Sequence, residues 1–61
     1  MKHLEGLNAI VNTGRETIKG TIKHVFRYRM YILVDGMLHG FNPAKIESMK
    51  VYFKNGIVEY K

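Results

Sequence analysis

The residues best suited to binding chemistry lie together in the stretch HVFRYRMY, residues 24–31, which interleaves arginines with aromatic side chains. Guanidinium groups bind phosphates, and aromatic rings stack on exposed bases, each stack contributing about 1–3 kcal/mol. Two lysines precede this stretch and would extend its cationic surface. We therefore expect a nucleic-acid-binding site made of six residues: Lys19, Lys23, Arg27, Tyr28, Arg29 and Tyr31.

The charge distribution favours the same interpretation. The formal net charge is +5, and residues 15–29 hold five basic side chains against one acid, Glu16, which gives +4 of that total. A local positive field attracts anionic partners at long range. Two other interpretations stay open for the same residues. They could dock on a larger protein, or they could form a solvated hairpin tip whose arginine stems cover apolar rings.

Few residues suit catalysis or metal binding. The chain has no cysteine, one serine, Ser48, and one aspartate, Asp35, so no nucleophile, base and orienting group can be named together. His24 and His39 would approach each other if neighbouring strands pair, but two imidazoles without carboxylate or thiolate support make a poor metal site. We expect partly buried core histidines instead, and we expect no enzymatic activity, no cofactor and no metal.

The conformation of residues 13–36 decides how these side chains are positioned. A helix has some support, because Thr13 and Glu16 have the spacing of a capping box. A strand fits better: from residue 15 to 24, polar or cationic residues alternate with apolar or small ones, and many are β-branched. Gly20 would cost a helix roughly 1 kcal/mol, whereas a glycine inside a strand marks a sharp bend or a bulge.

The rest of the chain reads as further short strands separated by turn signals. We expect strands at residues 7–11, 29–34, 37–41 and 48–54, and a last one after Asn55-Gly56. Asp-Gly and Asn-Gly are strong two-residue hairpin turns, and the segment after Asn42 suits a single 3₁₀ turn.

A two-residue turn at Asn55-Gly56 also fixes a register. It places Phe53 opposite Val58 and Val51 opposite Tyr60, so that apolar pairs fall on one side of the last hairpin.

Five to six short antiparallel strands with no long helix predict an all-β fold. We expect one domain, residues 1–61, forming a small, strongly bent, SH3-like barrel with a short 3₁₀ turn near 43–46. Closure of the barrel would remove exposed strand edges. The expected core is Leu7, Ala9, Val11, Ile18, Ile22, Val25, Met30, Ile32, Val34, Leu38, Phe41, Ile46, Val51, Phe53 and Val58.

The string GRETIKGTIKHV, followed by MYILVDG, resembles the KOW element of SH3-like barrels. The matching positions are Gly14, Gly20, Ile22, Val25 and Val34. The later FNPAKIESM is similar to the 3₁₀ turn before the last barrel strand. This resemblance implies binding of RNA or of other proteins, as in ribosomal proteins and transcription elongation factors. The same stretch also resembles the first half of an Sm or Hfq-type barrel, which implies a ring-forming subunit.

Together these features predict a small basic nucleic-acid-binding module, with RNA favoured over DNA. The alternatives are an adaptor or inhibitor of the kind that phages encode, docking on a larger protein through the same hairpin, and an Sm-like ring subunit.

The longest apolar run, residues 30–34, is far shorter than the ~20 residues that span a bilayer, and the lack of cysteine suits a reducing compartment. We expect a soluble, cytoplasmic monomer or small homo-oligomer with no membrane partner.

Overall fold

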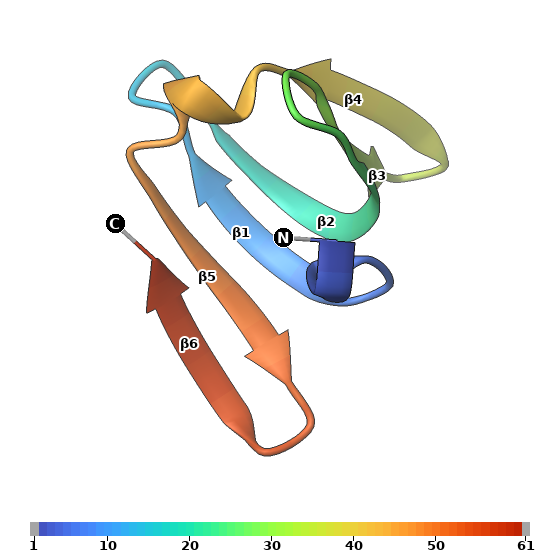
Figure 1. The fold of residues 1–61 in the computed structure, drawn as a ribbon, viewed down its shortest axis with the longest axis vertical. Coiled ribbons are helices and arrows are strands. Elements are labelled where there is room, and N and C mark those ends of the chain that lie inside the picture. The colour runs from blue at the N-terminus through green and yellow to red at the C-terminus, as the bar shows by residue number, and fades with distance from the viewer. Residues whose placement is uncertain (1, 61) are drawn as a thin grey trace.

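A computed structural model describes residues 2–60 of the chain. It contains six β-strands and two short 3₁₀ helices (Figure 1). In chain order the elements are η1 (Lys2–Leu4), β1 (Asn8–Asn12), β2 (Thr17–Val25), β3 (Met30–Val34), β4 (Met37–Phe41), η2 (Pro43–Lys45), β5 (Ser48–Phe53) and β6 (Gly56–Tyr60). Among these residues, no helix combines the length and the apolar character needed to cross a membrane.

All six strands belong to one antiparallel sheet with the order β4-β3-β2-β1-β5-β6, which confirms the predicted all-β class. β2 pairs with β1 through its first half and with β3 through its second half, so the sheet curves strongly (Figure 1). The expected closure is not found: within residues 2–60, β4 and β6 end the sheet on its two sides and do not pair with each other. The fold is therefore a bent, open sheet.

Gly20 lies where β2 passes from one partner to the other. It pairs with Ala9 in β1, and the β3 pairing begins at the next residue, Thr21. A side chain at position 20 would collide with the carbonyl oxygen of Leu33 and would come within 2.9 Å of Ile32 Cγ2. The glycine therefore allows β3 to approach the bend, as a glycine inside a strand predicts.

A bulge between Ile22 and His24 interrupts the alternation of side chains in β2. Ile22 pairs with Ile32 and His24 pairs with the next residue of β3, Tyr31, which leaves Lys23 as the inserted residue. Lys23 and His24 are both exposed as a result. The expectation of a partly buried His24 is wrong, because one inserted residue turns the following side chains to the other face.

The β3–β4 hairpin has the predicted turn. Asp35 and Gly36 have φ angles of +49° and +82°, as a type I′ turn requires, and Val34 pairs with Met37. The prediction for this turn is confirmed.

The β5–β6 hairpin closes one residue earlier than predicted. Lys54 and Asn55 form its turn, and Gly56, with φ of +147°, is the first residue of β6. Phe53 therefore pairs with Gly56, and Val51 pairs with Val58. The predicted pairs are wrong by two positions, because the glycine takes the positive φ just after the turn and Asn55 does not.

The residue pair that suggested a helix instead closes the β1–β2 loop. The Thr13 N–H donates to the Glu16 carbonyl over 3.0 Å, and the Glu16 N–H donates to Thr13 Oγ1 over 3.4 Å. Side-chain to backbone hydrogen bonds of this kind stabilise turns as well as helix ends. The spacing of Thr13 and Glu16 therefore did not distinguish a turn from a helix start.

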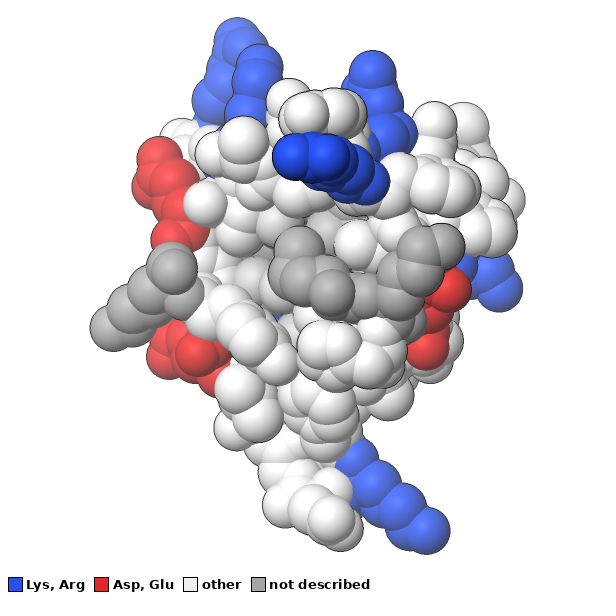
Figure 2. Space-filling model, in the orientation of Figure 1, with Lys and Arg blue, Asp and Glu red and all other residues white. Residues whose placement is uncertain are grey.

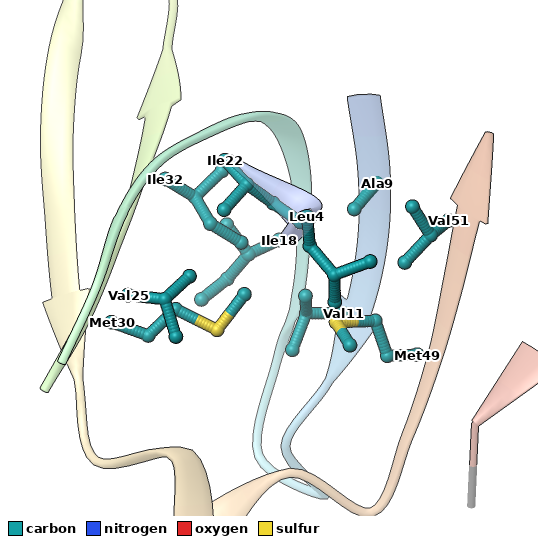
Figure 3. Packing of buried hydrophobic residues seen from close by; sticks show 10 residues of the cluster. All are labelled: Leu4, Ala9, Val11, Ile18, Ile22, Val25, Met30, Ile32, Met49 and Val51. Atoms are coloured by element: carbon teal, nitrogen blue, oxygen red, sulfur yellow. The ribbon is translucent and has the colours of Figure 1, made fainter. Parts of the chain in front are cut away.

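The core lies on the concave side of the sheet (Figure 3). Eight predicted positions are buried there: Ala9, Val11, Ile18, Ile22, Val25, Met30, Ile32 and Val51. Five more are partly buried and pack against them: Leu7, Val34, Phe41, Ile46 and Phe53. The expectation for Leu38 and Val58 is wrong: they are 53% and 43% exposed. Leu38 pairs with Leu33, the neighbour of the buried Ile32, so it faces away from the core, and Val58 pairs with the buried Val51 but lies on an edge strand.

Leu4 was not predicted in the core and is buried there, beside Met49. The side chain of Leu4 reaches from η1 into the middle of the cluster (Figure 3), and burying a leucine contributes about 1.5–3 kcal/mol. The residues after η1 hold it over the core through the backbone. The Gly6 N–H donates to the Ile22 carbonyl, and the Ile22 N–H donates to the Leu7 carbonyl.

Candidate nucleic-acid interface

Residues 26–29 form the loop between β2 and β3, directly after the bulged end of β2. The Phe26 N–H donates to the Arg29 carbonyl over 2.8 Å, which closes the loop. Just before it, the Val25 N–H donates to Glu5 Oε2 over 2.8 Å. The N-terminal segment therefore helps to hold the bulged end of β2 in place.

Three rings form a cluster beside this loop. His24 stacks on Phe26 with a centroid distance of 6.0 Å, and both rings meet Tyr31 edge to face at 6.3 Å. The bulge makes the cluster possible, because it brings His24 opposite Tyr31 on the exposed side of the sheet. We call His24, Phe26 and Tyr31 the ring cluster.

The loop adds a cation and a fourth ring. The Arg27 guanidinium carbon lies 5.5 Å from the centroid of the Tyr28 ring, within the range of a cation–π contact. Tyr28 is 69% exposed and Phe26 is 50% exposed. Tyr31 is partly buried and packs within the cluster, so Phe26 and Tyr28 expose more of their rings than Tyr31 does.

Cationic side chains gather at the same end of the molecule. Figure 2 shows Lys and Arg side chains projecting from the top, where the β1–β2 loop, the β2–β3 loop and η2 lie in Figure 1. Arg15 and Lys45 line one groove there, together with Phe41 and the acidic Glu16. We call Arg15, Arg27, Arg29 and Lys45, which these segments carry, the cationic end.

The structure brings five of the six predicted site residues to one end of the β2–β3 hairpin: Lys23, Arg27, Tyr28, Arg29 and Tyr31. Lys19 lies elsewhere. It precedes the bend at Gly20 and lines a separate groove with Asp35 and Tyr52. By simple alternation Lys19 would share a face of the strand with Lys23. The bend at Gly20 separates the two lysines, because the two halves of β2 run along different parts of the molecule.

Sequence reasoning missed three contributors to this surface. Phe26 was within the cationic and aromatic stretch but was not selected, and His24 was assigned to the core because the bulge leaves no clear signal in the sequence. Lys45 is far from the hairpin in the chain, and only the return of η2 beside the β1–β2 loop brings it close to Arg15.

His24 and His39 do not meet, and His39, like His24, is exposed where a partly buried core histidine was expected. His24 pairs with Tyr31 and His39 pairs with Ile32, and successive residues of β3 face opposite sides of the sheet. Among the described residues, no group of three potential metal-ligating side chains comes together. No family model, no curated protein and no solved structure matches the chain.

Proposed function

We propose that this protein binds single-stranded nucleic acid, with RNA favoured over DNA, through the β2–β3 hairpin. The observation that carries the proposal is the adjacency of accessible rings and cations on one loop: Tyr28 is 69% exposed and contacts Arg27. Unpaired bases stack on aromatic faces, and cations beside those rings bind the phosphates between the bases.

Each group has a role in this proposal. Phe26 and Tyr28 offer ring surface to bases, while His24 stacks on the Phe26 ring and Tyr31 meets that ring edge to face. Arg27 and Arg29, with Lys23, contact phosphates close to the stacked bases. Arg15 and Lys45 extend the phosphate path across the end of the molecule. Lys19 contributes to the long-range field only.

The resemblance to KOW elements supports the same proposal. Gly20 of the matched stretch lies at the bend of β2, and Val25 closes the hairpin opposite Met30. The resemblance implies RNA or protein ligands, and the exposed rings and cations of the hairpin favour the first.

A titration at two salt concentrations tests the proposal. Single-stranded RNA, single-stranded DNA and duplex DNA of mixed sequence are titrated against the protein, and we expect the single strands to bind more tightly. Changing Arg27 and Arg29 together to glutamate should flatten the slope of log affinity against log salt for RNA by about 1.4, since each phosphate contact on a single strand contributes about 0.7.

A matched variant separates a local site from net charge. Lys50→Glu with Lys54→Glu alters two exposed lysines outside the hairpin. Each substitution lowers the charge by two, so both double variants go from +5 to +1. We expect the second variant to keep most of the affinity. Equal losses in both variants would assign the binding to net charge, and no binding by the parent at low salt would remove the proposal.

The exposed rings also favour a second candidate, an adaptor that docks on a larger protein through the same hairpin. Exposed aromatic side chains are typical of protein interfaces. Capture from a lysate after nuclease treatment distinguishes the two functions. Docking would be favoured by two results together: a protein partner that binds the parent but not the Arg27 and Arg29 double variant, and a parent that has no affinity for nucleic acid.

A further inference from the structure

β4 presents an unprotected edge to its surroundings. Among residues 2–60, β4 pairs with β3 on one side and with no strand on the other, and it lies at the margin of the molecule (Figure 1). Met37 and Leu38 on this strand are 69% and 53% exposed. Natural edge strands are usually blunted by lysine, proline or a bulge, and β4, with the sequence MLHGF, has none of these.

The opposite edge of the sheet differs in charge. β6 carries Glu59, which pairs with Lys50 of β5, so a strand added there would lie beside a charged row. β4 has no residue that is formally charged at pH 7. Of the two edges, β4 is therefore the one that can accept another strand without bringing charges together.

We propose that the protein forms a two-fold symmetric dimer in which β4 pairs antiparallel with β4 of a second copy, centred on His39. This register places His39 opposite its own counterpart, Leu38 opposite Gly40 of the second copy, and Met37 opposite Phe41 of the second copy. Every second residue of β4 directs its N–H and C=O away from β3, and these groups would pair across the axis. An isologous contact of this kind closes at two copies.

The side chains of β4 are complementary in this register. Leu38 stands opposite a glycine, so its side chain has room. The nearest side chain at Gly40 is the Tyr31 ring of the same copy, which would lie 2.8 Å from a Cβ added there. Leu38 of each copy therefore packs against the Tyr31 ring of the other, and the symmetry makes this apolar contact twice.

The charges at the two ends of β4 also match. Asp35 lies in the turn before β4, and Arg29 immediately precedes Met30, which pairs with the last residue of β4, Phe41. Antiparallel pairing brings Asp35 of each copy to the Arg29 end of the other, about two strand spacings or ~10 Å apart. This attraction offsets part of the repulsion between two copies of charge +5.

Disulfide cross-linking tests the register directly, because the chain has no cysteine of its own. Residues opposite each other in antiparallel strands have Cα atoms about 4.5–5.5 Å apart, which suits a disulfide. We expect His39→Cys to form a covalent dimer on mild oxidation. Met37→Cys is the control: position 37 is also exposed, but the two thiols would be four residues out of register, about 13 Å apart, and should not link.

Sedimentation equilibrium tests the dimer without a cross-link. We expect the parent to reach twice its 7.1 kDa mass. Leu38→Lys should raise the dimer dissociation constant about 100-fold. The two-fold axis places the substitution in the interface twice, and each copy should weaken the dimer about tenfold. Ile57→Lys, at a position 59% exposed on β6, should leave the dimer intact.

Three results would overturn the proposal. The first is a parent that stays monomeric up to its solubility limit. The second is dissociation by Ile57→Lys in place of Leu38→Lys, which would assign the contact to β6. The third is equal cross-linking of the His39 and Met37 variants. None of these results depends on nucleic-acid binding, which the titrations measure separately.

Discussion

Tyr31 and Gly40 face each other across β3 and β4, and the tyrosine ring occupies the space that a side chain at position 40 would need. A Cβ at Gly40 would lie 2.8 Å from Cε1 and 3.1 Å from Cδ1 of the ring. The same ring meets His24 and Phe26 edge to face. A glycine on an edge strand therefore helps to fix the ring cluster of the hairpin.

Gly40→Ala should displace the Tyr31 ring and lower the free energy of unfolding by about 1–3 kcal/mol, as overpacking does. Urea denaturation measures this loss. In a Tyr31→Ala background the new methyl group has no ring to displace, so the loss should largely vanish in a double-mutant cycle. The same loss in both backgrounds would show that another contact requires the glycine.

Glu5→Ala should destabilise the bulged end of β2. The Val25 N–H donates to the Glu5 carboxylate, and removing the acceptor of a partly buried donor costs about 1–3 kcal/mol. Hydrogen exchange should show faster exchange of the Val25 amide. Glu5→Gln keeps an acceptor oxygen and should restore most of the protection; unchanged exchange in Glu5→Ala would argue against this contact.

Asp35→Val should destabilise the protein more than Asn55→Val. Asp35 has a φ of +49°, where a β-branched residue costs roughly 1–2 kcal/mol, whereas Asn55 does not have a positive φ. Thermal or urea denaturation of the two variants measures the difference. Equal losses would mean that the two turns share one geometry.

Phe26→Ala and Tyr28→Ala should each weaken binding to single-stranded RNA by about 1–3 kcal/mol, the contribution of one stacked base. Fluorescence anisotropy titrations measure the change. Tyr52→Ala is the control, because Tyr52 is also exposed, at 39%, and lies on β5 outside the hairpin. A comparable loss from Tyr52→Ala would place the bases elsewhere on the surface.

Local patterns predicted the strands well where a single rule applied. Ile18 and Ile22 are buried as the alternation in β2 requires, and Asp35-Gly36 takes the turn that its residues favour. The same rules failed at His24 and at Asn55-Gly56. In both places the backbone can pair with the neighbouring strand in more than one register, and contacts with that strand decide which register forms.

The candidate site was predictable to the extent that it is continuous in the chain. Arg27, Tyr28 and Arg29 occupy one loop, so their proximity follows from their sequence positions. Lys19 was expected beside them because it alternates onto the same face of the strand as Lys23. That inference requires a straight strand, and β2 bends at Gly20 between the two lysines. Lys45 joins Arg15 through the return of η2, a long-range relationship that no local pattern encodes.

The amino-acid order by itself determined the all-β class, the approximate strand positions and most of the core, because alternation, β-branching and turn residues act over a few neighbouring residues. Only the tertiary structure decided that the sheet stays open, that a bulge turns His24 outward, and that η1 covers the core with Leu4. These features depend on contacts between distant segments, where the free energy of packing outweighs local preference.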